Sequence, residues 1–240
     1  MNILAVDTTT KIASVSIQKG EEIFSNSIDN QITHSEKLLP LIDETLKKCN
    51  LNLKDIDKFG LINGPGSFTG IRIGLATIKA FSHVYKKDIF SISSLELIAL
   101  SYYLKNNFCD EKYIVSIIDA KNDRVYYSLY KVSAKNNKLC CTSICDIKND
   151  IIDDATKNLN DIFNEKNINK DDVIYAGILG NDLKEFLKEL EIHENYPTTK
   201  NLLDVYSCLE DKDSYTYNAF SLKAIYARAS QAERVKNGEK

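Results

Sequence analysis

The sequence contains no long hydrophobic run. Its longest apolar stretches, such as 3–6 and 114–118, are much shorter than the roughly 20 residues that a transmembrane helix needs. The N-terminus lacks a basic start, and Asp7 interrupts its apolar stretch too early for a signal peptide. We therefore expect a cytoplasmic protein without membrane attachment.

Metal-ligating residues are few and poorly spaced. The three histidines, His34, His83 and His193, form no HxxH or HxxxH pair, and the six cysteines form no CxxC pair. Reduced cysteines that fill space in the core fit this pattern better than a zinc site. His34 is expected to be a surface residue in the first turn of a helix, and we expect no bound metal.

A large excess of charge of one sign is also absent. The formal net charge is −3, and no stretch has the density of basic residues that is typical of a nucleic-acid surface. Any contact with RNA should therefore be weak for this chain alone. The only arginines are Arg72, Arg124, Arg228 and Arg234. Because a planar guanidinium can make bidentate contacts that lysine cannot, we expect specific contacts at these positions.

The apolar residues, 43% of the total, are enough to fill a core, and their order indicates a repeat. Alternation predicts three consecutive strands over 3–28 and three more over 113–145, each set followed by alternating helices and strands. The second set is the weaker one. This order predicts an α/β, actin/hexokinase-like (ASKHA) fold of two related halves, each a mixed β-sheet flanked by helices. The polar stretch 106–112 separates an N-terminal half, 1–106, from a more degenerate C-terminal half, 107–240.

A capping-box sequence, 33–36, predicts the start of the first helix. Behind it Leu38, Leu39, Ile42 and Leu46 share one face at helical spacing. Pro40 lies inside this segment, so the helix is either kinked there or regular only from that point. The apolar face needs a covering partner, which periodicity alone does not identify.

The clearest motif is GPGSFTGIRIG, residues 64–74, between a predicted strand and a predicted helix. It has no Walker A lysine, and its glycine spacing is one residue too long for GxGxxG. Phosphate binding at the helix N-terminus is one interpretation. Another is packing: Gly70 and Gly74 share a face with Ile71, Leu75 and Ile78, which predicts the close approach of another helix backbone. An internal core helix is the third.

A polar turn, Asp7-Thr8-Thr9, ends the first strand, and Asp119 ends the first strand of the second half. In actin-like phosphotransferases such a turn holds a magnesium-bound phosphate. Together with Gly66 and Ser67 these residues form a candidate nucleotide or anion site. A local Asx or Ser/Thr turn explains the same composition without any ligand.

The motifs together resemble the bacterial TsaB (YeaZ) family, whose members take part in making threonylcarbamoyladenosine at position 37 of tRNA. The matching segments are 3–9, 34–40, 64–74, 94–96, 119–121 with 125–126, and more faintly 226–228. They cover most of the first half and parts of the second. The glycine-rich string is highly specific to that family and its close relatives.

The resemblance implies a non-catalytic scaffold or activating subunit that binds a TsaD-like catalytic subunit and is joined by a TsaE-like ATPase. It places the contact on the two N-terminal helices, at these residues: His34, Leu38, Leu39, Ile42, Leu46, Gly70, Ile71, Gly74, Leu75 and Ile78. ATP and magnesium would be handled by the partners, and tRNA would be met only through the complex. Without a partner the same surface could form a homodimer. On this interpretation Gly74→Leu disrupts association more than folding.

Two alternatives from other classes remain. One is a small-molecule kinase that uses Asp7 and Asp119 with Mg-ATP. The other is a metal-dependent, glycopeptidase-like protein built on His34. The segment 176–180, AGILG, is only a thin version of the glycine-rich adenosine loop found in actin-like kinases.

Overall fold

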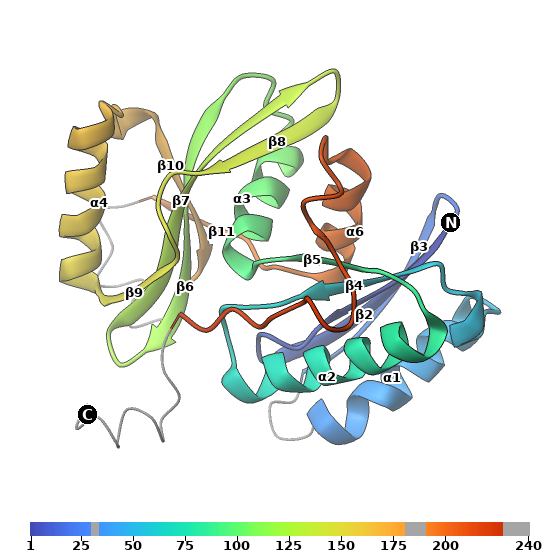
Figure 1. The fold of residues 1–240 in the computed structure, drawn as a ribbon. Coiled ribbons are helices and arrows are strands. Elements are labelled where there is room, and N and C mark those ends of the chain that lie inside the picture. The colour runs from blue at the N-terminus through green and yellow to red at the C-terminus, as the bar shows by residue number, and fades with distance from the viewer. Residues whose placement is uncertain (30–33, 181–190, 228–240) are drawn as a thin grey trace.

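The fold was obtained as a computed structural model, which describes residues 1–29, 34–180 and 191–227; the side chain of His34 is not among those described. Two six-stranded sheets stand side by side, with helices between and around them (Figure 1). The strands and helices of the first half are β1 (Asn2–Asp7), β2 (Ile12–Lys19), β3 (Glu22–Asp29), α1 (His34–Lys48), β4 (Lys58–Ile62), α2 (Phe68–Tyr85), β5 (Ile89–Ile92) and α3 (Ser94–Lys105).

The second half repeats this order with one additional strand before its first helix. Its strands and helices are β6 (Lys112–Lys121), β7 (Arg124–Lys135), β8 (Lys138–Ser143), β9 (Lys148–Ile151), α4 (Ile152–Lys166), β10 (Val173–Ile178), β11 (Ile192–Glu194), α6 (Thr199–Cys208) and β12 (Thr216–Tyr217). In each half three antiparallel strands come first, and the first of them then pairs in parallel with a later strand. The predicted internal repeat is therefore confirmed.

The sheet orders follow from these pairings. The first sheet runs β12-β5-β4-β1-β2-β3 and the second β11-β10-β6-β7-β8, with β9 also paired to β7. β1 and β6 lie at corresponding positions in the two sheets. Asp7 is the last residue of β1, whereas Asp119 lies two residues before the end of β6, at a register shift, and not at the strand end that the sequence predicted. Polar turns follow both strands.

Local sequence signals set several helix ends. The Ser93 side chain accepts a hydrogen bond from Glu96 N at 3.0 Å and caps the start of α3. α4 ends at Asn167, which takes the left-handed conformation that asparagine tolerates well. α1 is helical from His34 onward with Pro40 inside it, so Pro40 does not delay the start of the helix. Thr33, the predicted N-cap, lies outside the described residues.

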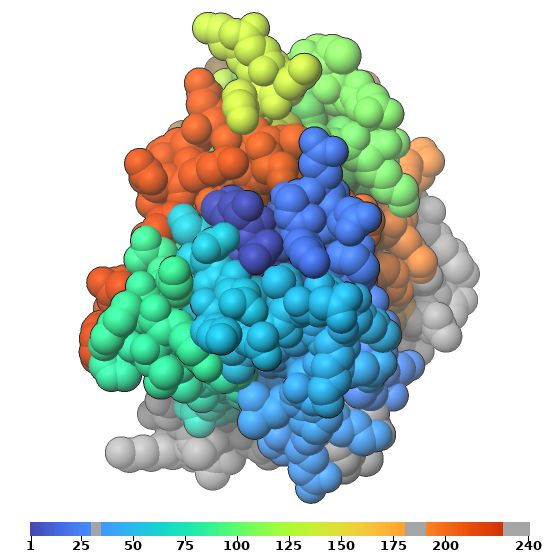
Figure 2. All heavy atoms as spheres, turned by 90° about the vertical axis from the view of Figure 1, so that its right-hand side faces the viewer, coloured from blue at the N-terminus to red at the C-terminus, as the bar shows by residue number. Residues whose placement is uncertain are grey.

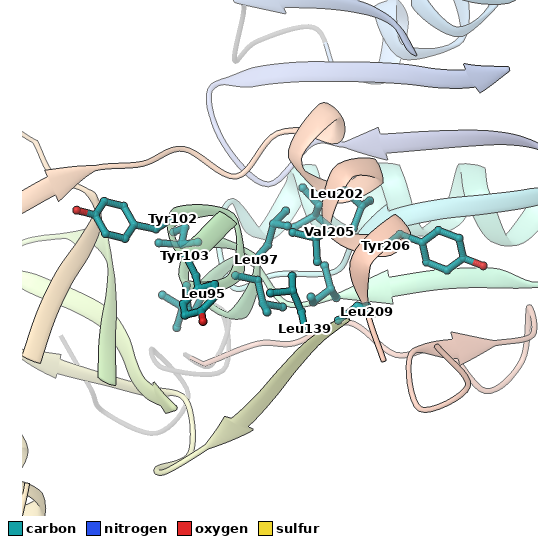
Figure 3. Close-up of a cluster of buried hydrophobic side chains, with 14 of the residues drawn as sticks. Leu95, Leu97, Tyr102, Tyr103, Leu139, Leu202, Val205, Tyr206 and Leu209 are labelled. Atoms are coloured by element: carbon teal, nitrogen blue, oxygen red, sulfur yellow. The ribbon is translucent and has the colours of Figure 1, made fainter. Parts of the chain in front are cut away.

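The largest core lies between the two sheets, where α3 packs against α6. In Figure 3 Leu97 of α3 lies beside Leu202 and Val205 of α6, and Leu95 lies next to Tyr103 on the other side of α3. Leu139 of β8 closes the cluster from the second sheet. Burial of this many apolar side chains from both halves stabilises them as one packed body.

The C-terminal segment does not stay with the second half, as the predicted boundary at residue 106 requires. After the second sheet the chain returns to the first half, where β12 pairs with β5 through Thr216 and Phe90. Leu209 also forms a β-bridge with Leu139. Figure 2 shows the orange-red atoms of this segment between the β7–β8 turn and the N-terminal strands. A division of the sequence at residue 106 therefore does not separate the two sheets. β12 belongs to the first sheet but lies 110 or more positions beyond residue 106. Local sequence patterns do not detect a pairing at that separation.

In the part of the chain that the structure describes, no helix has the length and apolar character needed to cross a membrane. All six cysteines are free thiols.

Candidate functional site

The glycine-rich loop packs directly on the turn that ends β1. The backbone N–H of Ser67 donates to Thr9 O at 2.7 Å, and the side chain of Ser67 accepts from Gly70 N at 3.2 Å as the N-cap of α2. Two backbone donors of the candidate anion loop are therefore used inside the protein. Only the remaining N–H groups at this helix start could bind an anion.

Gly70 and Gly74 face the same turn and not a second helix. A Cβ atom on Gly70 would lie 1.8 Å from Thr8 O, and one on Gly74 would lie 2.5 Å from Thr8 Oγ1. The Thr8 hydroxyl donates to Gly70 O at 2.7 Å in the buried interior. The spacing correctly indicated a close backbone approach, but the prediction that another helix makes this approach is wrong. The glycines are needed because α2 crosses the end of β1 with no room for a side chain.

Most of the predicted partner contacts belong to the chain's own core. Five of these side chains are at most 5% exposed and pack beneath the two helices: Leu38, Ile42, Leu46, Ile71 and Ile78. In this conformation they cannot reach a partner, which corrects the prediction for them. Leu75 is partly buried, whereas Leu39 is 54% exposed. His34 begins α1, but its side chain lies outside the described residues.

The outward face of the same two helices carries a different apolar set. α1 and α2 lie next to each other on one side of the first sheet (Figure 1). On α2, Ala76 and Ala80 are exposed and Val84 is 66% exposed, at intervals of four residues. Ile73 is half-buried one turn before them, and Leu39 projects from α1. This outward face is shallow because its central residues are alanines.

Asp7 is held by its own turn. Its Oδ1 accepts hydrogen bonds from Thr9 N at 2.8 Å and from Thr9 Oγ1 at 2.7 Å, and the residue is 1% exposed. Burial raises the pKa of the Asp7 carboxyl to about 6, and the bonds from Thr9 oppose that shift. The local Asx-type turn that the sequence allowed is therefore present.

The candidate anion residues meet only in part. A cleft of about 540 Å³ lies between the two halves, and Thr9, Gly66, Ser67 and Asp119 line it together. Asp7 lines an adjoining cavity, and Thr8 is buried beneath α2. The cleft therefore brings together fewer of the candidate anion-binding groups than the sequence predicted.

The charge inside the cleft is balanced locally. Asp119 accepts from Lys121 N at 2.7 Å, and Lys121 Nζ lies 3.3 Å from its second oxygen. Gly180 also lines the cleft, next to the Asp119 carboxylate, whereas Gly177 lies in β10 where a Cβ would be 1.8 Å from Ile117 O. Gly177, one of the two glycines in the AGILG segment, is therefore needed for the close pairing of two strands. Among the residues that the structure covers, no group of three His, Cys, Asp or Glu side chains could hold a metal ion.

The rare arginines make the specific contacts that their scarcity predicted, where they are described. The Arg72 guanidinium lies 3.9 Å from the Phe68 ring centre, and its Nε donates to Tyr226 Oη at 3.1 Å. Arg124 donates to the side-chain and backbone oxygens of Asn149 at 2.9 and 2.5 Å. Arg228 and Arg234 lie outside the described residues.

The contact of Arg72 holds the C-terminal segment against the glycine loop. Ile225 N donates to Asn63 O at 2.9 Å, and Asn63 Nδ2 donates to Lys223 O at 3.0 Å. The sequence did not predict that this segment returns to the glycine loop, nor the cavity beside Asp7. Its signals were the faint family match at 226–228, the isolated arginine and the serines on the inner face of β2, and none of them identifies a partner so distant in the chain.

Comparison with known proteins places the chain in a defined group. The profile of a family described as "TsaD: tRNA N6-adenosine threonylcarbamoyltransferase" matches residues 22–207. The chain is 35% identical over 140 residues to the tRNA threonylcarbamoyladenosine biosynthesis protein TsaB of Buchnera aphidicola subsp. Schizaphis graminum, covering 58% of this chain and 64% of that protein. It is 33% identical over 129 residues to TsaB of Haemophilus influenzae, covering 53% of each. The matches thus span between half and two thirds of these relatives.

A solved structure agrees on the fold. YeaZ from Pseudomonas aeruginosa superposes with a TM-score of 0.71 over 94% of this chain and 99% of that chain, at 17% sequence identity. At that identity the likeness concerns architecture alone. The predicted actin/hexokinase-like fold of two mixed sheets is confirmed. The resemblance to TsaB proteins is confirmed by the sequence matches.

Proposed function

The chain belongs to the tRNA N6-adenosine threonylcarbamoyltransferase (TsaD) family, and from this premise we propose that it is a non-catalytic, TsaB-like subunit of a complex that makes threonylcarbamoyladenosine in tRNA. In this proposal it docks on a TsaD-like catalytic subunit in the cytoplasm, and a TsaE-like ATPase joins them. tRNA is bound by the assembled complex and not by this nearly neutral chain alone.

The observation that carries the proposal is the outward face of α1 and α2. Ala76, Ala80 and Val84 follow one another at helical spacing, and Leu39 lies on the neighbouring helix. Small exposed side chains let a second helix backbone approach closely, and the larger apolar ones at the edge gain from being covered. This face replaces Gly70 and Gly74 as the contact surface, since those glycines are occupied by Thr8.

The state of the cleft supports a non-catalytic role. The Ser67 N–H, the Gly70 N–H and the Thr8 hydroxyl all donate within the protein. Asp7 Oδ1 already accepts two hydrogen bonds from Thr9. A phosphoryl-transfer site needs such groups to be directed at the ligand. We therefore assign ATP and magnesium to the partner subunits.

The proposal is tested by light scattering on mixtures with the TsaD-like subunit of the same organism. Ala80→Arg introduces a long charged side chain into the centre of the outward face, and we expect affinity to fall by about a hundredfold or more. Thr156→Arg, on the exposed face of α4, is the matched control and should bind like the unaltered chain. Undiminished binding by Ala80→Arg would exclude this face, and failure of the unaltered chain to bind would exclude the proposed subunit role.

The same face can pair two copies of the chain when the partner is absent. An isologous contact would bring α2 of one copy against α2 of the other. If so, Ala80→Arg also shifts a dimer of the isolated chain to monomer, which the same light-scattering measurement reports.

A further inference from the structure

A second cavity adjoins the cleft, and the proposed subunit role leaves it without a function. Its volume is about 430 Å³, and Thr10, Ile12 and Tyr196 line both spaces. The β2–β3 hairpin forms one wall, and the segment 196–200 at the start of α6 forms the other. This volume is within the range of small-molecule sites, which is roughly 300–1,000 Å³.

The wall of this cavity carries hydroxyl groups where a core would carry apolar side chains. Ser14 and Ser16 lie on the inner face of β2, 9% and 0% exposed, while Val15 faces α1. Ser16 Oγ lies 2.8 Å from Ser25 Oγ and 2.7 Å from Thr199 Oγ1, and Thr199 Oγ1 donates to Ser14 Oγ at 3.3 Å. The four hydroxyls thus form one chain across β3, β2 and α6.

Counting protons gives this hydroxyl chain a direction. Each hydroxyl has one proton to donate and two lone pairs to accept with. Because Thr199 uses its proton on Ser14, Ser16 must donate to Thr199, and Ser25 must then donate to Ser16. With Thr199 donating to Ser14, the other two bonds can form only in this direction. The proton of Ser14, at the end of the chain, is left for a group in the cavity.

A carboxylate lines the same cavity. Asp7 is the register partner of Ser14 in the β1–β2 pair, is 1% exposed, and lines the same cavity. Because the pKa of the Asp7 carboxyl is about 6, it carries a negative charge at neutral pH and disfavours an anionic ligand. Lys200, at the rim, does not offset this charge, since its Nζ lies 2.7 Å from Asp204 Oδ2.

From this arrangement we propose that the cavity binds a neutral, polyhydroxylated small molecule, either a free sugar or the ribose of a nucleoside. One ligand hydroxyl donates to the second oxygen of Asp7, since Oδ1 is bound by Thr9, and another accepts from Ser14. The ring of Tyr196, 45% exposed at the mouth, covers the ligand. A hydroxyl donor and a carboxylate acceptor in one cavity match vicinal hydroxyl groups better than they match a phosphate.

Amide-resolved NMR of the full chain tests this without any substitution. D-glucose, D-ribose and adenosine are added separately. Inorganic phosphate and 2′,3′-dideoxyadenosine, which lacks the vicinal 2′ and 3′ hydroxyls of the ribose, are the negative probes. We expect at least one sugar or adenosine to shift the amides of Ser14, Ser16 and Thr199, and neither negative probe to do so. A response to the free sugars identifies that source, and a response to adenosine alone identifies a nucleoside.

Two results would overturn the proposal. One is that none of the three hydroxylated probes shifts these amides at about 20 mM, a concentration that detects even very weak sites. The other is that dideoxyadenosine shifts them as strongly as adenosine, since the base and not the diol would then be recognised.

A matched pair of variants tests the directed proton. Ser14→Ala removes the donor, and we expect it to weaken binding about tenfold, the usual effect of losing one hydrogen bond. Thr156→Val removes an exposed hydroxyl on α4, which donates to Ile152 O at 3.0 Å, and should leave binding unchanged. Equal binding by Ser14→Ala and the unaltered chain would contradict the assignment. If Ser14→Ala does not fold, the amide map of the unaltered chain decides the question.

Discussion

The hydroxyl of Thr8 donates a hydrogen bond to the carbonyl oxygen of Gly70 at 2.7 Å, in the interior of the first half. This contact joins the end of β1 to the first turn of α2. It brings the helix so close that Gly70 and Gly74 have no space for a side chain. Gly70 and Gly74 have the spacing of a docking surface, but they pack inside the chain's own fold.

The first prediction concerns this contact. Gly74→Ala should destabilise the protein by about 1–3 kcal/mol, because overpacking against Thr8 Oγ1 exceeds the gain of at most about 1 kcal/mol in helix propensity. Adding Thr8→Ala removes the obstructing oxygen and should recover part of that loss. Gly70→Ala is the control, because its obstruction is the backbone oxygen of Thr8, which Thr8→Ala leaves in place.

Urea unfolding of the single and double variants measures both couplings. Recovery with Gly74→Ala but not with Gly70→Ala is the expected outcome; equal coupling would contradict the assigned contacts. Gly74→Leu should therefore fail to fold. A folded Gly74→Leu variant that has lost only its docking is not expected.

The second prediction concerns pH. Folding raises the pKa of Asp7 from 3.8 to about 6, so the folded state holds this proton more tightly than the unfolded state. The resulting stability is fully present below pH 3.8 and is lost as the pH rises through 6, by about 3 kcal/mol in total. Between pH 3.8 and 7 the unaltered chain should therefore lose about 3 kcal/mol of unfolding free energy relative to Asp7→Asn.

Urea titrations across this range give the comparison. Asp43→Asn, on the exposed face of α1, controls for the loss of a carboxylate as such. Parallel stability curves for Asp7→Asn and the unaltered chain would show that Asp7 titrates alike in both states.

The third prediction concerns Arg72. Its guanidinium stacks on the Phe68 ring and donates a hydrogen bond to Tyr226. Arg72→Lys should therefore loosen the C-terminal segment, because a lysine ammonium cannot stack on the ring and donate to Tyr226 at the same time. The loss of about 1 kcal/mol corresponds to roughly five- to tenfold faster exchange of the Ile225 amide hydrogen. Tyr226→Phe keeps the ring and should have a smaller effect. An unchanged exchange rate of the Ile225 amide in Arg72→Lys would show that the other hydrogen bonds are sufficient to hold the segment in place.

The fourth prediction concerns nucleotide. Because Ser67 N–H and Gly70 N–H are used internally, calorimetry of the isolated chain with Mg-ATP should give a Kd weaker than about 1 mM. Adding the partner subunits should produce nucleotide binding that the isolated chain lacks. Tight, magnesium-dependent binding by the isolated chain would instead favour the kinase alternative.

The sequence by itself determined the local elements and their order. Alternation identified the two sets of three consecutive strands, and the repeated order of strands and helices indicated two related halves. These features depend on neighbours within a few residues, so a linear pattern contains them. The specific glycine-rich string was also enough to indicate the family.

The tertiary structure alone decided what covers each face. Periodicity showed that Leu38 and Ile42 share a side of α1 but not that the protein's own sheet buries that side. It likewise could not assign Thr8 to Gly70 and Gly74, join Ser14 to Thr199, or return β12 to the first sheet. These pairings connect segments between 62 and 185 positions apart, where burial and hydrogen bonding, not local spacing, select the partner.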